Sequence, residues 1–261
     1  MTVRKVQPLV LTPLVGIPLV NEGDDLAGLF LDSLKKNQTQ LQQGDILVAA
    51  QKVVSKAEGR GVDLNTVTPS SRALKLAQET GKDPREVELI LQESKAVIRT
   101  RKGLIIVEHR LGFICANAGI DHSNVSPGKT PGEEWVLMLP ENPDRSAARI
   151  REQLESACGC RVGVVIIDSH GRAWREGTSG ISIGFSGVPG IVDLRGKPDL
   201  FDYHLRITEI AAVDELAAGA SLVMGQADEA IPAVHVRGFP YPLREGSFEE
   251  LPRKKEEDLF R

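Results

Sequence analysis

The stretch VGVVIIDS at residues 162–169 decides the architecture. Its apolar part predicts a buried strand, because a short continuous run rich in β-branched residues is typical of a strand covered on both faces. The run ends directly at Asp168 and Ser169. A carboxylate at the mouth of a buried strand is held by a rigid element and is still open to a hard cation. An aspartate that merely caps the following turn is the alternative interpretation.

A second buried strand is predicted at residues 46–50, ILVAA, after the turn Gly44-Asp45. We expect this strand to deliver Lys52, Ser55 and Lys56 to its end. A lysine there could bind phosphate, although a solvated surface lysine is the plainer interpretation of Lys56.

A third run, LGFICANAGID at residues 111–121, changes from apolar to small residues and ends at Asp121, with Asn124 shortly after it. Oxygen-bearing side chains at the ends of separate apolar runs favour a Mg²⁺ or Mn²⁺ site that shares ligands with a substrate phosphate, since Mg²⁺ seldom receives an all-protein cage. The sequence contains no P-loop and no G-x-G-x-x-G, so no standard nucleotide fingerprint supports this hypothesis.

Helices are predicted between these runs from apolar spacing and capping residues. They are expected at 26–36, from Ser70 to Gly81, after Asp83-Pro84, from Pro143 to Gly159, and over 207–224 with Ile207 as the first apolar position. Further strands are expected near the start of the chain, at 103–109 and at 135–139, with a loop at 126–134. The glycines of 177–190 indicate either a strand bend or a close approach to a ligand. Without strict alternation of strand and helix, an α+β fold is favoured over a doubly wound sheet.

Composition narrows the classes of function. The chain has 261 residues, and its 32 Lys and Arg against 36 Asp and Glu leave a net charge of −4, without a basic stripe, so nucleic acid is not an expected partner. No apolar run is long enough to cross a membrane. Three cysteines, two of them close together at Cys158 and Cys160, fit a reducing cytoplasm. Residues 1–240 are expected to form one domain, which could consist of two interleaved subdomains. The charge-dense residues 241–261 are expected to form a peripheral tail.

Five blocks resemble the coenzyme F420-0:L-glutamate ligases, the γ-glutamyl ligases of coenzyme F420. In order along the chain they are GIPLVNEGDDLA at 16–27, GDILVAAQKVVSKAEGR at 44–60, ICANAGIDHSNV at 114–125, VGVVIIDSHGRAWREG at 162–177 and LVMGQADEAIPAVHVRG at 222–238. The resemblance implies a family-specific α+β fold of mixed and antiparallel sheets flanked by helices, in an intertwined homodimer. It also implies a GTP-dependent ligase that joins L-glutamate to F420-0, with Mn²⁺ or Mg²⁺ and with K⁺ as a helper.

Carried over position by position, the resemblance implies metal ligands at Asp121, Asp168, Ser169 and Gln226, with Lys56, Asp121 and Asp168 central to catalysis. It implies GTP contacts at Ile17, Pro18, Leu19, Val20, Gln51, Lys52, Lys56 and Asn124, and over Met224, Gly225, Gln226, Ala227, Asp228, Glu229, Ala230 and Ile231.

This sequence departs from the family pattern in three places. Ser169 replaces a threonine, Gln226 stands where some relatives have glutamate, and residues 200–204, LFDYH, replace a common Gly-Arg pair. The last departure motivates a second hypothesis, an amide ligase of the same fold that acts on another carboxylate. A non-catalytic GTP-binding protein is the third.

Overall fold

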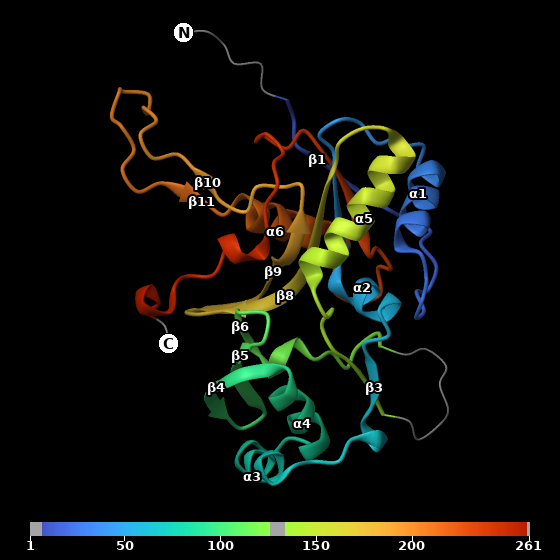
Figure 1. Cartoon of the computed structure of the whole chain (residues 1–261), viewed down its shortest axis with the longest axis vertical. Coiled ribbons are helices and arrows are strands. Elements are labelled where there is room, and N and C mark those ends of the chain that lie inside the picture. The colour runs from blue at the N-terminus through green and yellow to red at the C-terminus, as the bar shows by residue number, and fades with distance from the viewer. Residues whose placement is uncertain (1–6, 126–133, 260–261) are drawn as a thin grey trace.

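A five-stranded mixed sheet forms the centre of the molecule (Figure 1). The structure is a computed structural model that describes residues 7–125 and 134–259, so most of the predicted loop at 126–134 lies outside it. The strand order is β1-β12-β2-β8-β9, with β2 parallel to β8 and antiparallel pairing elsewhere. The bounds are β1 Val10–Pro13, β2 Ile46–Ala50, β8 Gly163–Arg172, β9 Arg175–Ser186 and β12 Ala233–Arg237.

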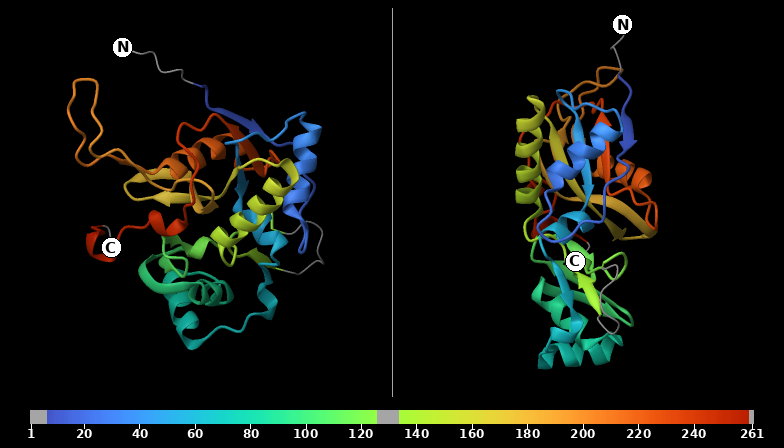
Figure 2. Two further views of the ribbon diagram at one scale, coloured as in Figure 1. Left: turned by 45° about the horizontal axis from the view of Figure 1, so that its top comes forward. Right: turned by 90° about the vertical axis from the view of Figure 1, so that its right-hand side faces the viewer.

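Helices cover both faces of this sheet (Figure 2). Helix α5 (Pro143–Cys158) packs on one face beside α1 (Leu26–Lys36), and α6 (Ala212–Met224) packs on the other. The glycines of β9 make this possible. A Cβ on Gly180 would lie 2.6 Å from the Ala217 carbonyl oxygen in α6, and one on Gly184 would lie 2.5 Å from the Pro143 carbonyl carbon in α5. These glycines therefore serve close packing of helices on a strand.

A second group of elements lies at one end of the central sheet (Figure 1). It contains a three-stranded antiparallel sheet, a two-stranded pair and two helices. Their bounds are β3 Gly61–Asp63, β7 Trp135–Leu137, β4 Ser94–Arg101, β5 Leu104–His109, β6 Ile114–Ala116, α3 Ser71–Thr80 and α4 Pro84–Gln92. Helix α2 (Gln51–Ala57) follows β2 directly and leads into this group. A hairpin with β10 (Val192–Asp193) and β11 (Glu209–Ile210) projects from the opposite end.

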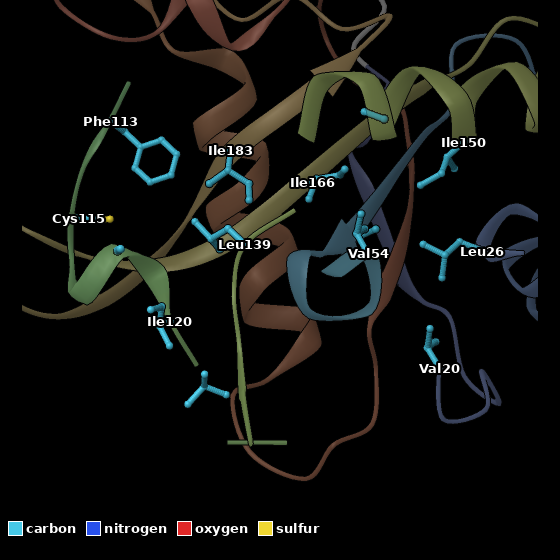
Figure 3. Close-up of a cluster of buried hydrophobic side chains, with 14 of the residues drawn as sticks. Val20, Leu26, Val54, Phe113, Cys115, Ile120, Leu139, Ile150, Ile166 and Ile183 are labelled. Atoms are coloured by element: carbon cyan, nitrogen blue, oxygen red, sulfur yellow. The ribbon is translucent and has the colours of Figure 1, made fainter. Parts of the chain in front are cut away.

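One hydrophobic cluster joins the two groups (Figure 3). Ile166 of β8 and Ile183 of β9 meet Ile150 of α5 on one side and Phe113 on the other. Val54 of α2 belongs to the same cluster, so the helix that follows β2 is anchored by its buried face. At about 25 cal/mol per Å² of buried apolar surface, such a cluster is the main favourable term in folding.

The α+β class is confirmed, and the capping residues act as predicted. Ser70 Oγ accepts a hydrogen bond from the Ala73 N–H at the start of α3, and Gly81 ends that helix at φ +68°. Gly159 ends α5 in the same left-handed conformation, which favours glycine.

Three predicted boundaries were wrong. The strand expected to end at Asp168 runs on to Arg172, because residues 168–172 pair with β9. The helix expected from Ile207 begins only at Ala212, because Glu209–Ile210 pairs with β10 instead. Lys52, Ser55 and Lys56 were expected at the end of a strand but belong to α2, because the chain turns directly from strand to helix at Ala50.

The segment expected to be a peripheral tail contacts the body. The Phe248 ring packs edge-on against Phe113, and the Phe248 N–H donates to Asp144 Oδ2 in α5. Glu245 accepts two hydrogen bonds from Arg151 of α5. The division into a domain at 1–240 and a tail stays a prediction. Within the described residues, no helix has the length and apolar character needed to span a bilayer.

Asp45, immediately before β2, ties this strand to β12. His235 Nε2 lies 2.8 Å from Asp45 Oδ2, and the Arg237 guanidinium donates to both carboxylate oxygens. Burial alone would raise the pKa of Asp45, but Arg237 and His235 outweigh it and lower the pKa to about 2.

We predict that Asp45→Asn lowers the free energy of unfolding by roughly 2–4 kcal/mol at pH 7, because it breaks a buried charge pair. The folded-state pKa lies below the ordinary value, so this stabilisation is present above about pH 4 and is lost as the pH falls toward 2. Urea unfolding at pH 7 and pH 3 measures both effects. Asp32→Asn, which breaks an exposed ion pair with Lys35, is the control and should cost less than about 1 kcal/mol. Equal losses in the two variants would contradict the prediction.

Candidate active site

A cleft of about 850 Å³ opens at the carboxyl end of β2, beside the middle of β8. Ala50 pairs with Ile167 in the parallel register, so Gln51 leaves the sheet next to Asp168, which stays in β8 and pairs with Ile181 of β9. Crevices at the carboxyl ends of parallel strands are where open sheets commonly bind ligands. All the predicted site residues except Asp121 line this cleft: Ile17, Pro18, Leu19, Val20, Gln51, Lys52, Lys56, Asn124, Asp168, Ser169 and the whole of 224–231.

Asp121 lies behind the cleft wall, where two side chains of α2 reach it. Gln51 Nε2 donates to Asp121 Oδ2 at 2.6 Å, and Lys52 Nζ lies 3.4 Å from Oδ1. The Asp121 backbone is paired with Leu137 beside β7. Burial raises the pKa of Asp121, and the negative charge of Asp168 raises it further, against the opposing effect of Lys52. The two carboxylates predicted from separate apolar runs are therefore close enough to repel each other.

Asp168 is held from behind by a histidine. Its Oδ2 lies 2.8 Å from Nε2 of His170, two residues along β8, and both side chains are largely buried. Successive side chains of a strand alternate between its faces, so Asp168 and His170 share one face while Ser169 projects from the other.

Two lysines stand one helical turn apart on α2, and both line the cleft. Lys52 Nζ donates to the carbonyl oxygen and the hydroxyl of Ser123, at 3.2 and 3.0 Å. Burial lowers the pKa of Lys56, and the positive charge of Lys52 lowers it further. An anionic group in the cleft would relieve this repulsion, so the pair is suited to phosphate.

The third wall is formed by residues 224–231, which follow α6. Ser169 Oγ donates to Gln226 Oε1 at 2.8 Å, and Gln226 Nε2 donates to Ser221 Oγ at 3.0 Å. Asn124 Nδ2 donates to the Ala227 carbonyl oxygen at 3.1 Å and so joins this wall to the loop after Asp121.

The oxygen donors here are suited to a hard divalent cation. Asp168, Ser169 and Gln226 bring a carboxylate, a hydroxyl and an amide oxygen to the cleft, Asp121 lies beside it, and Mg²⁺ and Mn²⁺ bind such oxygen ligands. In residues 7–125 and 134–259, no three His, Cys, Asp or Glu side chains gather at one point. These side chains therefore supply part of a coordination shell, and phosphate or water oxygens would have to complete it.

Sequence reasoning missed several residues of the cleft. His122, Trp135 and Ser221 line it, together with the apolar Val53, Val125 and Ile167. Trp135 lies in the short strand β7, and its ring covers Gly61 of β3. His122, Val53, Val125 and Ile167 adjoin predicted site residues in the chain, so the sequence could have indicated them. Trp135 and Ser221 reach the cleft through strand pairing and helix packing, which no local pattern reveals.

Asp168 in the cleft and Asp121 beside it thus lie next to Lys52 and Lys56, an arrangement suited to a cation and an anion side by side. The family model for F420-0:γ-glutamyl ligases matches residues 15–238. The chain therefore belongs to the F420-0:γ-glutamyl ligase family.

Relatives from several methanogens match over most of the chain. It is 47% identical over 249 residues to the coenzyme F420:L-glutamate ligase of Methanothermobacter thermautotrophicus, which covers 94% of this chain and 96% of the relative. The enzyme of the same name from Methanocaldococcus jannaschii is 46% identical over 224 residues, or 86% of this chain and 87% of the relative. The one from Methanococcus maripaludis strain C6 is 46% identical over 247 residues, or 94% of each chain.

Proposed function

We propose that this chain ligates L-glutamate to coenzyme F420-0 in the cleft between β2 and β8, and that GTP drives the reaction. The observation that carries the proposal is the meeting of Asp121 and Asp168 with Lys52 and Lys56 around one cleft, in a chain that matches named F420:L-glutamate ligases along almost its whole length.

A carboxylate is a poor acyl donor, so the ligation needs activation. In the proposed reaction the γ-phosphoryl group of GTP passes to the terminal carboxylate of F420-0, giving an acyl phosphate and GDP. The amine of L-glutamate then attacks the acyl carbon, phosphate leaves, and an amide forms. Later rounds on the γ-carboxylate of the added glutamate would lengthen the tail with γ-linked residues. No protein nucleophile is needed, so the chain's task is to position the reactants and to neutralise charge.

Each part of the cleft has a role in this scheme. Lys52 and Lys56 would hold phosphate oxygens, and the partial burial of Lys56 strengthens its contact because fewer waters compete with it. Gln51 keeps Asp121 in place from its buried position at the start of α2. Residues 224–231 and Asn124 form the wall that would close on the nucleotide.

Asp121, Asp168, Ser169 and Gln226 are the residues that would hold Mn²⁺ or Mg²⁺, with K⁺ as an additional cation. Bound there, a divalent ion supplies Lewis-acid stabilisation of the transferring phosphoryl group. Gln226 brings an amide oxygen where some relatives have a carboxylate, so this chain should hold the metal less tightly than a glutamate-bearing relative would.

The departure at residues 200–204 lies on the projecting β10–β11 hairpin and not in the cleft of the same chain. The second hypothesis, another carboxylate acceptor, therefore has no support from the cleft of the same chain and stays a prediction. The hairpin exposes large apolar side chains, among them Leu200 (83%), Phe201 (89%) and Ile207 (88%). Such a patch is typical of a protein–protein contact, which supports the proposal of a homodimer in a cytoplasmic enzyme.

We predict that purified protein releases GDP only when F420-0, L-glutamate, GTP and Mn²⁺ are all present, with a product heavier by one or more glutamate residues. Asp168→Asn should lower kcat/KM by roughly 10²-fold or more, since it removes a charge that holds the catalytic cation. Mass spectrometry and a GDP assay measure both. Asp32→Asn, on the exposed face of α1, is the control and should be unaffected. Glutamylation of other acids but not of F420-0 would favour the second hypothesis, and unchanged turnover in Asp168→Asn would remove that residue from the site.

We also predict that GTP changes the fluorescence of Trp135. The chain has two tryptophans, and Trp174 is 88% exposed outside the cleft. In Trp174→Phe, only the cleft tryptophan reports, so GTP with Mg²⁺ should change its emission in a saturable way, and ATP should act far more weakly. Trp135→Phe, which keeps Trp174, is the matched control and should stay silent. A fluorescence change in Trp135→Phe alone would place the nucleotide outside the cleft. Tight GTP binding without turnover on any acceptor would favour the third hypothesis, a non-catalytic GTP-binding protein.

The homodimer proposal predicts a solution mass of twice the chain's 28.3 kDa. Replacing Leu200, Phe201 and Ile207 together by serine should shift the protein toward monomer, because it removes the exposed apolar surface of the hairpin. Light scattering coupled to size exclusion measures the mass. Leu222→Ser, at an 88% exposed position on α6, is the control. A dimer lost in the control but kept in the triple variant would place the interface on α6.

A further inference from the structure

His170 is a buried histidine that the reaction scheme does not use. It is 7% exposed and shares one face of β8 with Asp168. Its Nε2 lies 2.8 Å from Asp168 Oδ2 and has no regular hydrogen bond in the part of the chain that the structure describes. Oδ2 of Asp168 is thus a polar atom in contact with this buried nitrogen.

Aromatic packing fixes the imidazole from behind. The Phe113 ring lies 5.2 Å from that of His170 and is tilted by 54°. On its other side Phe113 stacks flat on His109, with ring centroids 5.0 Å apart and an interplanar angle of 2°. His109 is fully buried, and its Nδ1 accepts a hydrogen bond from the Leu111 N–H. The His170 ring thus packs on Phe113, which in turn packs on the hydrogen-bonded ring of His109.

A second acid near His170 has a partner of its own. Asp214 of α6 lies within electrostatic reach of the imidazole, but its Oδ1 accepts a hydrogen bond from the Ser182 N–H at 2.9 Å. Asp168 differs from Asp214 because it both contacts His170 through Oδ2 and lines the cleft.

Asp121, like Asp168, has one carboxylate oxygen in contact with a buried polar side chain, in this case Gln51. One of its oxygens accepts from the buried amide of Gln51, and the other faces Lys52 at the cleft. A carboxylate fixed through one oxygen presents the other in a defined direction, as a monodentate ligand requires. Partners that orient metal ligands in this way commonly change metal affinity by 10- to 100-fold.

We propose that His170 is a positioning residue for the metal centre: its imidazole holds Oδ2 of Asp168 so that the other carboxylate oxygen faces the cation, and Phe113 fixes the ring. The inference rests on the proposed function, because it requires that Asp168 bind a divalent cation.

The test compares two nearly isosteric replacements. His170→Gln keeps a donor that can reach Oδ2, and His170→Met does not. The probe is Mn²⁺ alone, because electron paramagnetic resonance counts free Mn²⁺ and gives the Kd without turnover. We expect the Kd of His170→Met to rise about tenfold or more, and that of His170→Gln to stay close to wild type.

His235 supplies a matched control. Its Nε2 lies 2.8 Å from Asp45 Oδ2, so it is a second buried histidine on a carboxylate, at the opposite end of β2 from the cleft. His235→Met should lower the melting temperature and leave the Kd for Mn²⁺ unchanged, which separates a local effect from general destabilisation. If His170→Met does not fold, as judged by circular dichroism, His170→Asn takes its place, because a shorter amide cannot reach Oδ2.

The outcomes are distinct. Wild-type affinity in the folded His170→Met or His170→Asn protein would overturn the inference and leave the proposed function standing. An equal loss in His170→Gln and His170→Met would also overturn it, since the donor would then not matter. If the wild-type protein binds no Mn²⁺, the inference fails together with the metal part of the proposed function.

Discussion

The parallel register of β2 against β8 is the constraint on which the cleft depends. It sets Ala50 of β2 beside Ile167 of β8. Helix α2, which carries Lys52 and Lys56, therefore begins next to Asp168. A slip of one residue would turn the side chains of β8 to the opposite face and direct Asp168 away from Asp121. The register is secured at the far end of β2, where the Gly163 N–H donates to the Asp45 carbonyl oxygen and the Asp45 carboxylate binds Arg237 of β12. This buried ionic cluster lies outside the cleft and stabilises the pairing of β2 with β12.

Much of this could be predicted from the sequence, since the signals are local. Apolar runs of four to six residues predicted β2 and β8, and the capping residue Ser70 marked the start of a helix. Carboxylates at the ends of separate apolar runs were expected to share one site, and Asp121 and Asp168 do lie close enough to interact electrostatically. The resemblance to a family supplied nearly all the other positions of the cleft, which spacing alone could not have named. Their chemical roles remain predictions.

The failures have a physical cause as well. Helix α2 was missed because QKVVSKA contains two β-branched valines, whose intrinsic preference favours a strand. Burial of Val54 against the central cluster reverses that preference, and no local pattern reveals such a tertiary contact. Trp135 and His170 were missed for the same reason. Trp135 reaches the cleft through pairing of β7 with β3, and the role of His170 depends on Phe113, more than fifty residues earlier in the chain.

The balance of charge in the cleft links the two ligands of the proposed reaction. Asp168, Asp228 and Glu229 line the cleft with Lys52 and Lys56, and Asp121 lies beside Lys52, so acidic groups outnumber the lysines and oppose the binding of a bare triphosphate. A divalent cation between Asp121 and Asp168 lowers the repulsion between these acids and any phosphate, and a phosphate supplies the oxygens that the protein lacks. Each ligand therefore raises the affinity for the other by the same factor, as thermodynamic linkage requires. The neutral amide of Gln226 strengthens this dependence, because it leaves more of the cation's charge to the phosphates than a carboxylate would.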